Sequence, residues 1–192
     1  MTVAVAFLQP GWADWEAGHV LASLREYFGV QIEIATPTGD PETSIGGVLA
    51  AADYRFDDPV LSDADAYLLI GSDAWQGYDN DAVFSQLRQA HADGKIVAGI
   101  CGATIALAKA GLLAGKAHTS NGKDWLAEQA PGYAGAEGYV ESPRAVVDGR
   151  IVTASGSAPV TFSAEVTRLI APEASERLDG YVAMFAREFG EG

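Results

Sequence analysis

The chain is poor in cysteine and histidine. Cys101 is the only cysteine among 192 residues, and the three histidines are His19, His91 and His118. A single cysteine excludes a disulfide within the chain and a zinc site built from several cysteines, and it is typical of the reducing cytoplasm. So few histidines also limit both metal sites and histidine-dependent catalysis. We therefore expect a cytoplasmic protein with no metal and no other cofactor.

Positive charge and long apolar runs are also scarce. The chain has 12 Lys and Arg against 26 Asp and Glu, a net charge of −14. Nucleic-acid binding needs basic patches, so we expect no nucleic-acid partner and interpret the acidity as a source of solubility. No apolar run approaches the roughly 20 residues of a membrane span, and no basic segment precedes the first apolar run, so we expect neither membrane association nor a signal peptide. Without repeats or linkers, residues 1–192 are expected to form one domain.

What the chain does contain is an alternation of apolar strands and amphipathic helices. Near-continuous apolar runs predict buried strands at residues 2–8, 66–70 and 96–100, and an alternating run predicts another at residues 30–35. Apolar residues at helical spacing predict helices, the first with Asp14 as its N-cap, at residues 14–28, 79–93, 103–113, 158–170 and 173–187. Strands that alternate with helices indicate an α/β fold, with a mostly parallel sheet between two layers of helices.

Shorter elements complete this pattern. Residues 44–55 predict a short hairpin or an edge strand, and residues 61–65 a helical turn. Residues 117–120 predict a short strand, and residues 123–129 one or two helical turns. Residues 139–147 and 150–154 predict a hairpin that turns at Asp148-Gly149.

The stretch at residues 95–121 contains the main candidate for a functional site. A buried strand runs directly into Cys101, and a helix follows. A cysteine at this crossing lies at the carboxyl end of the sheet, where the first N–H groups of the helix favour a thiolate. The same geometry with serine is the nucleophile elbow, in which small neighbours, here Gly99, Gly102 and Ala103, permit a tight turn. We interpret Cys101 as a reactive thiol; the alternative is an inert buried cysteine.

A working cysteine needs oxyanion donors and a group that manages a proton. The N–H of Gly102 follows the nucleophile, and Gly71 and Ser72 end the neighbouring strand at the same edge of the sheet. Glu16 lies in the first turn of the first helix, where burial would raise its pKa and let the protonated carboxyl donate to sulfur. An acid at this position also complements the helix dipole without any further role. His19 and His118 are weaker candidates, since a lone histidine is commonly structural.

These residues resemble the DJ-1/PfpI superfamily, which is related to class I glutamine amidotransferases. The resemblance lies in the elbow at residues 99–104 (GICGAT), the run at 110–116 (AGLLAGK) and the block at 119–121 (TSN). Residues 13–16 (ADWE) resemble the family's early acidic motif, and residues 68–72 (LLIGS) stand where the family has a strand ending in Pro-Gly-Gly. The order and spacing agree from residue 2 to residue 170.

The resemblance implies a flavodoxin-like three-layer sandwich and often a homodimer. It also implies that Cys101 is the nucleophile and Glu16 the acid hydrogen-bonded to it. The oxyanion site would lie at the N–H groups of Ser72 and Gly102.

Two positions depart from the family pattern. Relatives that resemble intracellular proteases carry a histidine directly after the cysteine, where this chain has Gly102. Relatives with a DJ-1-like triad carry a histidine at the end of the Thr-Ser block, where this chain has Asn121. On a strand, His118 would point to the face opposite Asn121, so it is no simple replacement. Asn121 and His118 are therefore predicted as substrate-binding residues. Asn121 cannot transfer a proton, because an amide takes none at neutral pH.

Three functions remain open. The first is a cysteine-dependent enzyme acting on a small carbonyl or amide substrate, glyoxalase- or deglycase-like or amidase-like, with Cys101 as nucleophile and Glu16 as proton shuttle. The second is a redox or oxidative-stress sensor, in which Cys101 is oxidised to a sulfinic acid without hydrolytic turnover. The third is a binding module with a vestigial site.

Overall fold

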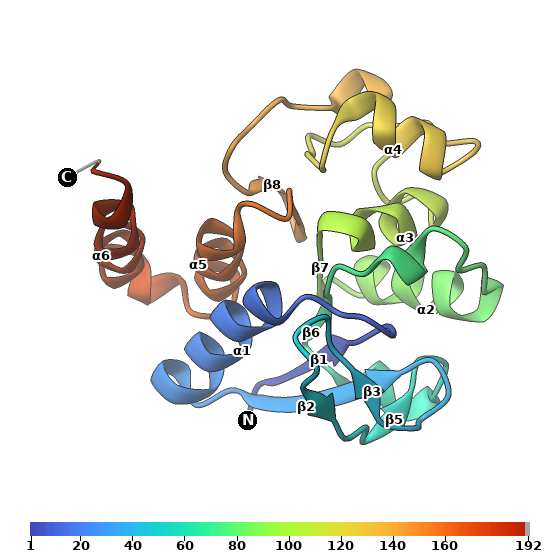
Figure 1. The fold of residues 1–192 in the computed structure, drawn as a ribbon, viewed down its shortest axis with the longest axis horizontal. Coiled ribbons are helices and arrows are strands. Elements are labelled where there is room, and N and C mark those ends of the chain that lie inside the picture. Colours follow the sequence, from blue (N-terminus) through green and yellow to red (C-terminus); the bar gives the residue numbers. More distant parts are fainter. Residues whose placement is uncertain (191–192) are drawn as a thin grey trace.

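A seven-stranded sheet forms the centre of the computed structural model, which describes residues 1–190 (Figure 1). Its strand order is β5-β2-β1-β6-β7-β9-β8. The strands are β1 (Val3–Phe7), β2 (Gln31–Thr36), β5 (Tyr54–Arg55), β6 (Ala66–Leu69), β7 (Ile96–Ile100), β8 (Val146–Asp148) and β9 (Ile151–Ala154). All neighbouring pairs are parallel except β8 and β9. The predicted mostly parallel sheet is therefore confirmed.

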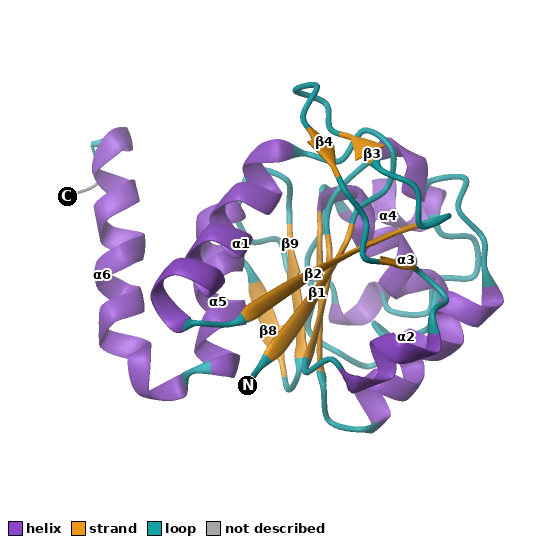
Figure 2. Cartoon of the chain, turned by 90° about the horizontal axis from the view of Figure 1, so that it is seen from below, coloured by secondary structure: helices purple, strands orange, loops and turns teal. Residues whose placement is uncertain are grey.

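Helices cover both faces of this sheet, as Figure 2 shows. On one side lie α1 (Asp14–Phe28), α5 (Pro159–Ile170) and α6 (Ser175–Ala186), and on the other lie α2 (Asp81–Ala92), α3 (Thr104–Lys109) and α4 (Lys123–Gln129). Alternate residues of β1 serve the two faces: Ala4 and Ala6 belong to the core beneath α1 and α5, whereas Val5 and Phe7 belong to the core beneath α2 and α3. This double burial explains why the strand sequences are apolar throughout, and it makes the fold a flavodoxin-like three-layer sandwich.

Short elements fill the connections. β3 (Glu42–Thr43) and β4 (Leu49–Ala50) form a small antiparallel hairpin, while β5 joins the edge of the main sheet. The edge strand predicted within residues 44–55 is thus present as β5. The hairpin is present too, but its first strand lies at Glu42–Thr43, before the predicted range. Short 3-10 helices lie at Pro59–Asp63, Asp73–Trp75, Cys101–Ala103, Ala136–Gly138, Pro172–Ala174 and Arg187–Phe189.

Three predicted boundaries were wrong. The helix expected to reach residue 113 ends at Lys109, because Gly111 takes a left-handed φ of 75° and the chain turns there. The strand expected at residues 139–147 is confined to Val146–Asp148, since Pro143 has no N–H for a ladder. Residues 117–120 form only a single bridge, between His118 and Tyr139.

Asp14 is not the N-cap of α1. Ala13 holds that position without a side-chain cap, while the Asp14 carboxylate accepts hydrogen bonds from Ser44 Oγ at 2.5 Å and from the N–H of Gly46 at 2.8 Å. Asp14 therefore fastens the β3–β4 hairpin to the start of α1. The other end of α1 agrees with prediction, since Gly29 ends the helix in a left-handed conformation.

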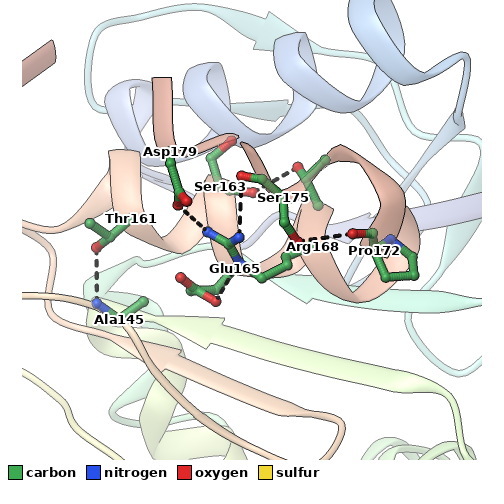
Figure 3. A network of polar contacts seen from close by, with 9 residues as sticks. Ala145, Thr161, Ser163, Glu165, Arg168, Pro172, Ser175 and Asp179 are labelled. Carbon is green, nitrogen blue, oxygen red and sulfur yellow. Dashed lines mark hydrogen bonds and ion pairs between the residues drawn. The ribbon is translucent and has the colours of Figure 1, made fainter. Parts of the chain in front are cut away.

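The last helix, α6, lies outermost in both views and packs on α5. Figure 3 shows its main polar tie, in which Arg168 of α5 pairs with Asp179 of α6 at 3.0 Å and with Glu165 of its own helix at 3.4 Å. Leu178 is the one buried residue that α6 contributes. Residues 191–192, which the one-domain prediction includes, lie outside the described part of the chain. Across residues 1–190, no helix combines the length and the hydrophobicity that crossing a membrane requires.

Candidate functional site

Cys101 lies directly after β7 in the strained turn that the sequence predicts. Its φ of 57° makes it the one residue other than glycine with a positive φ among residues 1–190. A side chain in this region costs about 1–2 kcal/mol, so the surrounding structure must hold the turn. A Cβ on Gly102 would lie 2.4 Å from the carbonyl oxygen of Ser72, and a Cβ on Gly99 would lie 2.9 Å from Leu107. The small neighbours are therefore required by packing, and the nucleophile elbow is present.

Glu16 reaches the elbow from the first turn of α1. Its side chain is fully buried (0% exposed), and Oε2 accepts a hydrogen bond from the N–H of Gly71 at 2.8 Å. A Cβ on Gly71 would lie 2.4 Å from Glu16 Oε2 and 2.7 Å from Cys101 Cβ. Only a glycine thus lets the carboxyl and the cysteine meet at this point. The other oxygen, Oε1, has no conventional hydrogen-bond partner within residues 1–190, and it lies on the side of the sulfur.

Burial and mutual repulsion set the protonation of this pair. Burial raises the pKa of Glu16 from 4.5 to about 7, against the opposing effects of the Gly71 N–H and the thiol. Burial and then the negative charge of Glu16 raise the pKa of Cys101 to about 11, against the opposing effects of the Asn121 amide and the Gly102 N–H. The lowered thiol pKa expected at this position is therefore not found, because desolvation and the neighbouring carboxylate raise it instead. Protonation of Glu16 removes the second of these effects and so lowers the pKa of the thiol.

An amide and a glycine turn close the other side of the sulfur. Asn121 Nδ2 donates to Cys101 Sγ at 3.2 Å, and its Oδ1 accepts the N–H of Gly156 at 2.9 Å. Because a backbone N–H can only donate, it fixes the orientation of this amide and turns the NH₂ group toward sulfur. A Cβ on Gly156 would lie 2.8 Å from Sγ and 3.0 Å from Glu16 Oε1. The carbonyl of Gly156 accepts the indole N–H of Trp15, which is 48% exposed, at 3.0 Å.

Sequence reasoning missed Gly156 and Trp15. The signal that could have found the first is the Ser-Gly-Ser turn at residues 155–157, which follows β9 at the carboxyl edge of the sheet. Trp15 directly precedes Glu16 on α1, so one turn of helix supplies both the buried carboxyl and the indole that holds the Gly156 turn.

Of the remaining candidate residues, Ser72 lies at the site, whereas His118 and His19 lie outside it. The carbonyl of Ser72 lies against Gly102. The backbone N–H of Ser72 donates no hydrogen bond within the described residues, so this N–H is free for a ligand. His118 does not join the group: it is fully buried, and its ring nitrogens contact the Lys116 carbonyl and the Tyr133 hydroxyl. His19 also lies elsewhere, with Nδ1 3.0 Å from the hydroxyl of Tyr181 on α6.

The site therefore consists of one thiol, one buried carboxyl, one amide and the backbone N–H groups of Gly102 and Ser72. Residues 1–190 contain no group of three or more histidine, cysteine or acidic side chains arranged to hold a metal ion. The chemistry available to these groups is nucleophilic attack by sulfur, proton transfer to a carboxyl near neutrality, and stabilisation of an anion.

Comparison with known proteins gives consistent matches. The family described as the DJ-1/PfpI family matches residues 1–169. A Bacillus subtilis (strain 168) protein named Uncharacterized protease YoaZ is 34% identical over 163 residues, covering 81% of this chain and 77% of that protein. A second protein of the same organism, named Uncharacterized protease YdeA, is 32% identical over 189 residues, covering 96% of this chain and 91% of that protein.

Among solved structures, a DJ-1 superfamily protein from Agrobacterium tumefaciens superposes with a TM-score of 0.86 and 38% identity, covering 98% of this chain and 100% of that one. The family match spans the residues that carry the Cys101 elbow, the buried Glu16 and the surrounding sheet. The chain therefore belongs to the DJ-1/PfpI family.

Proposed function

We propose that this protein is a cysteine-dependent enzyme that acts on a small carbonyl or amide substrate, with Cys101 as nucleophile and Glu16 as the group that moves the proton. The observation that carries this proposal is the Glu16 carboxyl, which is fully buried beside the thiol. Burial raises the pKa of this carboxyl to about 7. A carboxyl with this pKa can both accept and return a proton at neutral pH, so the chain needs no histidine for that role.

In the first step, Cys101 Sγ forms a bond to the carbonyl carbon, the C=O π electrons move onto oxygen, and the thiol proton moves to Glu16. The N–H groups of Gly102 and Ser72 hold the resulting oxyanion. With a 2-oxoaldehyde, Glu16 returns the proton to the oxyanion and gives a hemithioacetal. The carboxylate then moves the proton from the carbon bonded to sulfur to the neighbouring carbonyl carbon through an enediol, and water hydrolyses the resulting thioester to a 2-hydroxy acid and the free thiol. With an amide, the proton passes to the departing nitrogen, and water then hydrolyses the thioester. The carboxyl thus serves as base and then as acid within one cycle.

Activity on a panel of 2-oxoaldehydes and small primary amides tests this proposal. Cys101→Ala and Glu16→Gln should each lower turnover by at least about 100-fold, which is typical for loss of a nucleophile or a general base. Glu26→Gln, an exposed acid on the same helix, is the matched control and should keep full activity. Absence of turnover on every compound, or full activity of Glu16→Gln, would refute the enzyme proposal.

A second candidate function is a sensor of peroxide. The observation that favours it is Asn121, which donates to sulfur but cannot accept a proton. Two equivalents of peroxide oxidise Cys101 through the sulfenic to the sulfinic acid and release two molecules of water, and the Asn121 amide and Gly102 N–H hold the anion. Intact mass after peroxide treatment should show a stable gain of two oxygens that Cys101→Ser lacks. No such gain would exclude the sensor.

The broader expectations accompany this proposal. We take residues 1–192 as one domain that works in the cytoplasm, as a homodimer, on a small-molecule substrate. Size-exclusion chromatography with light scattering tests the dimer, and a single mass equal to the 20.0 kDa chain would contradict it.

A further inference from the structure

The chain contains two asparagines, Asn80 and Asn121, and only Asn121 is followed by a glycine. Asparagine is a chemically labile residue, and a following glycine offers no side chain to hinder attack of its backbone nitrogen on the asparagine side chain. In this protein the labile pair, Asn121-Gly122, lies at the sulfur of the candidate nucleophile. A chemical change of the Asn121 side chain would therefore alter the surroundings of the Cys101 sulfur.

The local geometry leaves the attacking nitrogen free and polarises the amide that it would attack. Asn121 is exposed to solvent, and the backbone N–H of Gly122 donates no hydrogen bond within residues 1–190. The Asn121 carbonyl oxygen accepts the N–H of Gly156 at 2.9 Å. This donor polarises the amide carbon and can stabilise the oxyanion that forms when a nucleophile attacks it, as oxyanion-hole donors do.

We infer that Asn121 is a modification site, where deamidation turns the amide beside the Cys101 sulfur into a carboxylate and lowers the reactivity of the thiol. The Gly122 nitrogen forms a bond to the Asn121 side-chain carbon, and ammonia leaves with the proton that this nitrogen loses. Water then opens the cyclic imide at either carbonyl and gives aspartate or isoaspartate. The balance is one water consumed and one ammonia released, with no oxidant, reductant or metal.

The product reverses the role of the side chain. A carboxylate only accepts hydrogen bonds, so it can still receive the Gly156 N–H but can no longer donate to Cys101 Sγ. It also adds, beside Glu16, a second negative charge within contact distance of the sulfur, and a like charge disfavours the thiolate. Each unit by which the thiol pKa rises lowers the thiolate population tenfold. This consequence rests on the proposed function of Cys101, whereas the modification itself does not.

The test follows the purified full chain during incubation at mildly alkaline pH and physiological temperature, with peptide mapping and parallel iodoacetamide labelling of Cys101. The peptide with Asn121 should gain about one mass unit, while Asn80, whose side chain caps α2, should stay unchanged. Labelling should slow in step with this gain. Gly122→Ala should slow the gain, because a Cβ there hinders the attack. This Cβ would contact only Trp125 Cβ at 3.7 Å, but the φ of 159° at Gly122 disfavours a side chain, so circular dichroism must first show that the variant keeps its fold.

Two variants separate the modification from its effect. Asn121→Asp, which is the product, should label at least about tenfold more slowly than the fresh chain at the same pH. Asn121→Gln keeps an amide and should not acquire the loss of labelling on incubation. The inference is overturned if Asn121 stays intact while the unfolded chain deamidates under the same conditions. It is also overturned if Asn121→Asp labels as fast as the fresh chain. Failure of the fresh chain to react with substrates or peroxide would instead refute the proposed function and leave the mass result standing.

Discussion

Replacing Glu16 by glutamine should remove a pH dependence of stability that the wild-type chain shows between about pH 5 and pH 8. Burial raises the pKa of this carboxyl from 4.5 in the unfolded chain to about 7 in the folded protein. The folded state therefore binds the proton more tightly than the unfolded state. This contribution to stability is fully present below about pH 4.5 and is lost as the pH rises through 7.

The size of the effect follows from the difference between the two pKa values. At roughly 1.4 kcal/mol per unit, the full loss is about 3 kcal/mol. About 2.5 kcal/mol of this loss falls between pH 5 and pH 8, which corresponds to about 5–10 °C in Tm for a chain of this size. Cys101 does not confuse the measurement, since its pKa rises from 9.0 to about 11 and it titrates above this window. The variant should fold, because glutamine is isosteric and its amide oxygen can still accept the Gly71 N–H.

Urea unfolding, followed by tryptophan fluorescence at several pH values, measures this effect. The difference in unfolding free energy between wild type and Glu16→Gln cancels the titration of every other group. The wild type should lose unfolding free energy relative to Glu16→Gln as the pH rises. Glu26→Gln, which replaces an exposed acid on the same helix, should show no such trend. A flat difference, or one that favours the wild type at higher pH, would show that Glu16 stays ionised and would refute the proton-transfer role built on it.

Three further changes test the geometry around the sulfur. Cys101→Gly should be more stable to urea than Cys101→Ala by about 1 kcal/mol, because glycine relieves the left-handed backbone at this position; equal stability would contradict the strained elbow. Gly156→Ala should destabilise the fold by about 1–3 kcal/mol and slow alkylation of Cys101, since its Cβ would lie 2.8 Å from Sγ; unchanged values would mean that the turn yields freely. Asn121→His should add a titration near neutral pH to the alkylation profile of Cys101, because imidazole can accept the thiol proton; an unchanged profile would mean that the new ring does not reach the sulfur.

Much of the fold could be predicted from the sequence. Strands buried on both faces have no polar face, so β1, β6 and β7 stand out as short apolar runs, and the helices between them carry an apolar stripe. Boundaries set by local backbone chemistry were also predictable, as with Gly29 at the end of α1. The end of α3 was harder to predict, since two glycines, Gly111 and Gly115, follow its apolar run and both adopt a left-handed φ, so either could have ended the helix.

The sequence by itself determined the family, the three-layer architecture and the place of Cys101 in a tight turn between a strand and a helix, because a strand-Cys-Gly-helix crossing is a local pattern. Only the tertiary structure decided what surrounds that sulfur. Gly156 meets Cys101 and Glu16 across long stretches of chain, at a contact so close that a single Cβ would prevent it. The protonation of the pair was decided in the same way, because desolvation depends on everything packed around Glu16 and not on its neighbours in sequence.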